Sequence, residues 1–133
     1  MHFDCLLKEA SYDQKMAKII LRLLTALWAL SIARGAIVRG YRLGAILETI
    51  VLAHLAKHLG VFAVLGILLM FSFDTPSLRL LGIWLGIAFG LNTELYEHLA
   101  FHGHIEYGDV LIDALGVLAG PAAAPLLKRT GNA

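Results

Sequence analysis

The chain has 133 residues, of which 59% are hydrophobic and only 16% are charged, and its mean hydropathy is +0.75. A typical soluble domain is about 45–50% apolar and about 25% charged, so this composition excludes intrinsic disorder and predicts a small membrane protein of a single domain. The net charge of +1 argues against a nucleic-acid partner, and the one cysteine, Cys5, excludes an internal disulfide or a multi-cysteine zinc site.

A helix that crosses a bilayer needs about 20 mostly apolar residues. Four segments meet this requirement: residues 19–38, 49–73, 78–101 and 109–127. The second apolar stretch begins as early as residue 43 and would form a helix of roughly 46 Å, so it either leaves the bilayer at its start or breaks near Gly60. Asp74 to Ser77 predicts a turn before the third span.

Residues 1–18 are too polar to span a bilayer, and they predict a short amphipathic helix at the membrane surface. We therefore expect an all-α, polytopic transmembrane helical bundle with about four spans and a short N-terminal amphipathic segment. Four spans place seven lysines and arginines on the side of both termini and three on the other side. The positive-inside rule then predicts that both termini are cytoplasmic.

The charge is distributed unevenly along the chain. Residues 1–79 carry a net charge of +4, whereas residues 80–127 contain no lysine or arginine and five carboxylates. These are Glu94, Glu97, Glu106, Asp109 and Asp113, and the same half holds His98, His102 and His104. Ionisable groups inside a membrane are costly, and they face a bundle interior or a cavity.

The spacing of small residues indicates which helix faces are packed. Gly82, Gly86 and Gly90 form a stripe on one face of the third span, and this stripe continues into Glu94 and His98. Small residues at this spacing allow helices to pack closely in lipid, so we expect Glu94 and His98 to face another helix. If the last connection joins an antiparallel pair, the following residues converge: Glu94, Glu97, His98, His102, Asp109 and Asp113.

Such a cluster has three interpretations. Imidazoles and carboxylates together suit a divalent transition metal such as Zn or Fe, with the ligands Glu94, Glu97, His98, His102 and Asp113. His54 and His58 on the second helix also have the spacing to share one ion, whereas Glu48 lies on another face.

The second interpretation is a set of protonated or hydrogen-bonded carboxylates for proton relay or general acid–base catalysis. In this case the catalytic residues are Glu94, Glu97, Asp109 and Asp113. The third interpretation is structural: the acids pair with arginines of other spans, such as Arg34, Arg39 or Arg79, and the His54–His58 pair lies at the membrane interface.

Two acidic motifs of the C-terminal part carry a resemblance to a known family. Glu94-x-x-Glu97, followed by Asp109-Val-Leu-Ile-Asp113-Ala-Leu-Gly116-Val-Leu-Ala-Gly120, resembles the end of VanZ-like membrane proteins over about 40 residues. The family pattern carries an arginine before the last span, where this chain has Phe101-His102-Gly103-His104-Ile105-Glu106. The resemblance implies a bacterial inner-membrane protein that acts on or senses an envelope lipid or antibiotic through its acidic cluster.

Three functional hypotheses follow from these features. The chain is a VanZ-like membrane protein that contacts membrane lipid, a metal-binding membrane enzyme or metal or proton carrier, or an accessory subunit. In the last case, the stripe of Gly82, Gly86 and Gly90 would mediate a homo-oligomer or a larger membrane complex.

Overall fold

The computed structural model describes residues 2–38, 51–101 and 106–130, with side chains described for 11–38, 53–101 and 106–123. The described parts form four helices and no strand: α1 (His2–Val38), α2 (Val51–Ser72), α3 (Pro76–Phe101) and α4 (Tyr107–Thr130). The all-α prediction is therefore confirmed. Three helical segments are long and apolar enough to cross a membrane, namely Ser11–Val38, Ala53–Ser72 and Pro76–Phe101. Crossing by residues 109–127 of α4 stays a prediction.

The outer surface of the bundle is apolar, as expected for a membrane protein. Large apolar side chains are exposed along the helices, including Leu27, Leu30, Leu80, Trp84 and Leu111. In water such a surface would drive aggregation, whereas in a bilayer it meets lipid chains.

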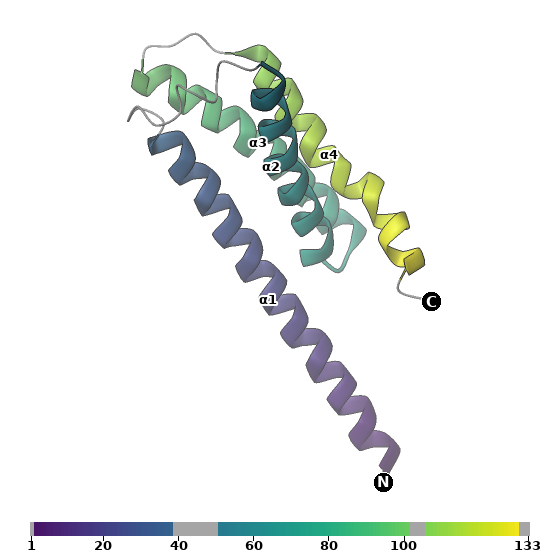
Figure 1. Ribbon diagram of the computed structural model, residues 1–133. Coiled ribbons are helices and arrows are strands. Elements are labelled where there is room, and N and C mark those ends of the chain that lie inside the picture. Colours follow the sequence, from purple (N-terminus) through teal and green to yellow (C-terminus); the bar gives the residue numbers. More distant parts are fainter. Residues whose placement is uncertain (1, 39–50, 102–105, 131–133) are drawn as a thin grey trace.

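The first helix differs from the prediction of a separate surface helix. Residues 2–18 are helical, but they form the first turns of one continuous α1 of 37 residues. No glycine or proline interrupts the sequence before Gly35, so nothing breaks the helix where its polarity changes. At about 1.5 Å per residue α1 is roughly 55 Å long, and Figure 1 shows its N-terminal part extending past the bundle.

The second helix runs through Gly60 without a break, which excludes one of the two alternatives for this stretch. The other alternative concerns residues 43–50, which lie outside the described residues. The predicted turn after α2 is confirmed. Thr75 is the N-cap of α3, because its Oγ1 accepts a hydrogen bond from Leu78 N at 3.3 Å and its carbonyl accepts one from Arg79 N at 3.0 Å. Pro76 occupies the first helical position, which proline favours.

Polar contacts hold α1 against the C-terminal end of α2. Lys18 Nζ donates to Phe71 O at 2.9 Å, and Arg22 Nε donates to Ser72 O at 3.2 Å. These carbonyls lack partners within α2, so the two cations cap the negative end of its dipole. One turn further along α1, Thr25 Oγ1 lies 2.8 Å from the buried Ser72 Oγ.

The chain reverses direction at each connection, so α2 and α4 run parallel and α1 begins at the end of the bundle where α4 ends (Figure 1). Glycines bring the backbones of α2 and α4 into contact. A Cβ at Gly116 would lie 2.8 Å from Leu59 O, and one at Gly120 would overlap the backbone of Gly66. The buried core beside this contact consists of Phe62, Leu65, Leu69, Ile83 and Val117.

The glycine stripe of α3 also packs inside the bundle. Gly82, Gly86 and Gly90 are all buried, as the spacing predicted. A Cβ at Gly86 would meet Leu69 at 2.9 Å, and one at Gly90 would meet Asp113 Cβ at 3.1 Å. These close contacts are made within the chain, and docking of a partner through this stripe stays a prediction.

Candidate metal centre

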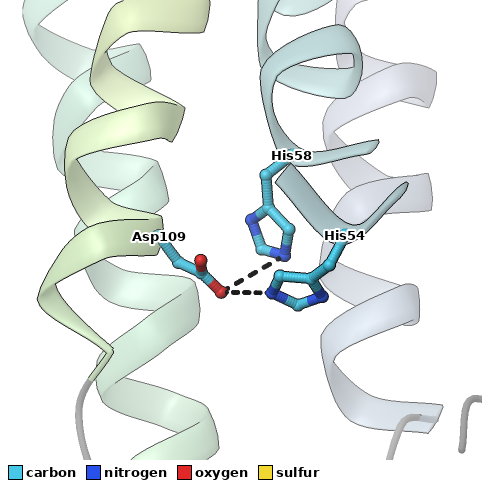
Figure 2. A group of neighbouring side chains, drawn as sticks. All are labelled: His54, His58 and Asp109. Atoms are coloured by element: carbon cyan, nitrogen blue, oxygen red, sulfur yellow. Dashed lines mark hydrogen bonds and ion pairs between the residues drawn. The ribbon is translucent and has the colours of Figure 1, made fainter. Parts of the chain in front are cut away.

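Two histidines of α2 face two aspartates of α4. His54 Nε2 lies 2.7 Å from Asp109 Oδ2, and His58 Nδ1 lies 2.9 Å from Asp113 Oδ1. Both pairs are separated by 55 positions in the sequence, as expected for parallel helices whose i,i+4 residues share a face. Figure 2 shows His54 and His58 from one helix converging on Asp109 of the other.

His58 lies at the centre of this arrangement. Its Nε2 is 3.6 Å from Asp109 Oδ2 while its Nδ1 is hydrogen-bonded to Asp113, so both ring nitrogens face carboxylates. The rings of His54 and His58 are 4.6 Å apart between centroids. When Nδ1–H donates to Asp113 in the neutral ring, the Nε2 lone pair faces Asp109. In that tautomer, a metal ion between the Nε2 lone pair and Asp109 would be attracted to both.

The carboxylates of the centre are deeply buried. Glu94, Asp109 and Asp113 are 6%, 5% and 1% exposed, and Asp113 Oδ2 has no hydrogen-bond partner in the described structure. Within the described residues, no lysine or arginine forms an ion pair with any of the three. Burial of this much negative charge is costly unless a positive charge compensates it.

The ligand atoms form two overlapping groups. His54, His58 and Asp109 bring one ligand atom each to within 4.8 Å of one another, and so do His58, Glu94 and Asp113. Two ligands at about 2.0–2.1 Å from a tetrahedral zinc ion are roughly 3.3 Å apart. The 2.7 and 3.6 Å separations of the first group bracket this spacing.

The packing of α2 against α4 fixes this geometry. The backbone contacts at Gly66, Gly116 and Gly120 set the register about one to three turns below the four polar side chains. Asp109 lies in the first turn of α4, where Asp109 N donates to Glu106 O at 2.9 Å. The positive end of the helix dipole stabilises a carboxylate at this position.

The residues predicted from the sequence separate into two sets. The structure brings Glu94, Asp109 and Asp113 together, but with His54 and His58 of α2 rather than with His98. Glu97 and His98 are half-buried and belong to neither group of ligand atoms, and His102 lies outside the described residues.

Two of the three arginines proposed as structural partners can be placed, and neither forms an ion pair with Glu94, Asp109 or Asp113 among the described residues. Arg79 donates to Phe73 O at 2.9 Å, at the opposite end of α3 from Glu94. Arg34 is exposed on α1, and Arg39 lies outside the described residues.

Sequence reasoning missed the pairing of α2 with α4, because it assumed that the two acidic spans, which are consecutive, form the closest pair. A signal was present in the sequence. His54 and His58 have the same i,i+4 spacing as Asp109 and Asp113, and small residues follow each pair on the same helix. Matched i,i+4 pairs on two helices form a ladder when the helices are parallel.

Comparison of the chain with models of protein families, with curated proteins and with solved structures finds no match. The resemblance to VanZ-like proteins therefore stays a prediction.

Proposed function

We propose that this membrane protein binds a divalent transition-metal ion between α2 and α4, with His54, His58 and Asp109 as its ligands. One observation carries the proposal: His58 Nδ1 lies 2.9 Å from an oxygen of the buried Asp113, while its Nε2 lies 3.6 Å from Asp109, which is also hydrogen-bonded to His54. Metal-binding histidines typically donate their second ring nitrogen to a carboxylate in this way, which fixes the tautomer and the orientation of the ring.

Two nitrogens and one carboxylate oxygen suit Zn or Fe. Three protein ligands leave a further coordination position, which is typical of catalytic rather than structural zinc sites. A bound ion would polarise an oxygen ligand at that position, and it would also offset the buried negative charge of Asp109, Asp113 and Glu94. In this assignment Asp113 is a positioning residue, because it acts through His58.

The test is metal analysis of protein purified in detergent without a polyhistidine tag and loaded with one equivalent of zinc. We expect wild-type protein to retain close to one equivalent after desalting. His54→Gln and Asp109→Asn should lose the ion, and Asp113→Asn should bind it about 10- to 100-fold more weakly, as expected for a ligand-orienting carboxylate. Far-UV circular dichroism and gel filtration check that each variant keeps the helical fold.

His98→Gln is the matched control, because His98 lies near the same end of the bundle but in neither group of ligand atoms. It should retain the full equivalent of zinc. Loss of zinc in His98→Gln but not in His54→Gln would contradict the proposed ligands and support the ligands predicted from the sequence, which include His98. Wild-type protein that binds no Zn, Fe or Mn would also refute the proposal, and a proton on His58 would then be the compensating cation.

A further inference from the structure

A cavity of about 220 Å³ lies on the other side of His58, between α1, α2 and α3. Its volume exceeds the roughly 150 Å³ of an apolar cavity that holds benzene. Most of its lining is apolar or small, and the ionisable groups come from α2 and α3, while Ser31 of α1 adds a hydroxyl. The apolar and small lining residues are Trp28, Ile32, Gly35, Ala36, Val61 and Phe62.

The polarity of the lining changes along the bundle axis. Lys57, His58, Glu94 and Glu97 line the end of the cavity where α1 and α3 terminate. Val61 and Phe62 lie one turn deeper on α2, where Trp28 Nε1 donates to Val61 O at 3.0 Å. A bilayer has the same gradient, with polar head groups at the surface and chains inside. An amphiphile in the adjacent leaflet therefore has the orientation needed to enter the cavity.

Glu94 determines the head group that fits. Its side chain lines the cavity and is buried, and within the described residues no lysine or arginine forms an ion pair with it. Neighbouring carboxyl groups add to the negative potential, because an oxygen of Asp113 lies within 4.8 Å of one of Glu94 and Glu97 lines the same cavity. A carboxylate in this position favours a cationic ligand group, and an intramembrane acid of this kind marks a functional site.

We propose that the cavity binds a membrane amphiphile with a protonated amine head group, with Glu94 as the counter-ion and the apolar chain between Trp28 and Phe62. The inference goes beyond the proposed metal function and does not depend on it, since Glu94 is not one of the three proposed metal ligands. The cavity holds only the part of the chain next to the head group. The rest of the chain remains among the lipids beside α1.

Tryptophan fluorescence measures occupancy directly. Trp84 is 63% exposed on the outer surface of α3, so a Trp84→Phe background leaves Trp28 as the one tryptophan in the sequence. In detergent micelles, a terminally brominated undecylamine should quench Trp28 saturably. The affinities of the matching brominated alcohol and carboxylic acid should be at least about tenfold lower than that of the amine, because neither carries a positive charge.

Two glycines provide a matched pair of variants, one that blocks the cavity and one that serves as its control. A Cβ at Gly35 or at Gly60 would meet no atom within 4 Å, but only Gly35 lines the cavity. Gly35→Leu should fill the cavity and abolish saturable quenching, whereas Gly60→Leu should bind the amine as the background protein does. Glu94→Gln should remove the preference for the amine over the alcohol while weaker binding of both remains.

Equal quenching by all three probes in the background protein would overturn the proposal, and so would unchanged amine binding in Gly35→Leu. Zinc content is measured on the same samples. Retained zinc without amine selectivity refutes this inference alone, whereas amine selectivity without zinc binding refutes the metal proposal alone.

Discussion

The contact between α2 and α4 should couple the stability of the bundle to metal affinity, and Gly116→Ala tests this coupling. A Cβ at Gly116 would lie 2.8 Å from Leu59 O and 3.0 Å from Ala63 N, whereas ordinary contact begins at 3.4 Å. Both atoms belong to the backbone of α2, so no side-chain rotation can relieve the overlap. The helices must separate by about 0.6 Å, and overpacking of this kind typically costs about 1–3 kcal/mol.

Gly60→Ala is the control for this prediction, since a Cβ at Gly60 in α2 would meet nothing within 4 Å. Alanine is favoured over glycine in a helix interior by about 1 kcal/mol. This gain is shared by both variants, so the difference between their free energies of unfolding isolates the steric cost. We expect Gly116→Ala to be less stable than Gly60→Ala by about 1–3 kcal/mol in reversible SDS unfolding followed by circular dichroism.

The same separation should weaken the site. His58 Nδ1 and Asp113 Oδ1 are 2.9 Å apart, and a further 0.6 Å or so would exceed the usual limit of about 3.2 Å for a hydrogen bond. Zinc affinity, measured by competition with a chelating dye, should therefore fall about tenfold in Gly116→Ala and stay unchanged in Gly60→Ala. Equal stability and equal zinc affinity of the two variants would refute the argument that this contact sets the register of the site.

Three further predictions concern the contacts of α1 and the α2–α3 turn. Trp28→Phe removes the hydrogen bond to Val61 O and should cost about 1 kcal/mol of unfolding free energy in the same SDS assay, whereas Trp84→Phe at the exposed position should cost close to nothing. Thr25→Val keeps the branched shape but deprives the buried Ser72 of its hydroxyl partner, and it should cost about 1 kcal/mol of unfolding free energy. Ser31→Ala removes only an exposed hydrogen bond within α1 and should leave the unfolding free energy unchanged. Equal effects of the two substitutions would contradict this prediction. The hydrogen bond and charge of Lys18 hold the pKa of Asp74 below its ordinary value of 3.8, so the stability that this pair contributes is fully present above that pH and is lost as the pH falls through the lowered pKa. The melting temperature of wild-type protein in detergent should therefore exceed that of Asp74→Asn at pH 7 and match it near pH 2, and a difference that persists there would argue against the ion pair.

The burial of Glu94 shows what the spacing of residues within one helix can predict about packing, and what it cannot. The glycine stripe of α3 correctly predicted that Glu94 faces another helix, because i,i+4 spacing is a property of one helix alone. Glu97 is three positions further along and lines the same cavity as Glu94, but it is only half-buried and belongs to neither group of ligand atoms. The sequence pattern identified the face but could not identify which helix covers it.

Composition and local pattern were sufficient for the membrane class, the helices, the turn at Asp74 and the packed glycine faces, since each depends on residues close together in the chain. The partnership of His54 and His58 with Asp109 and Asp113 was decided only in the tertiary structure. It requires that α2 and α4, which are not consecutive, run parallel in one register. That register arises from backbone contacts at Gly66, Gly116 and Gly120. The i,i+4 spacing of Gly116 and Gly120 marks a packed face of α4, but it does not identify the helix that packs there.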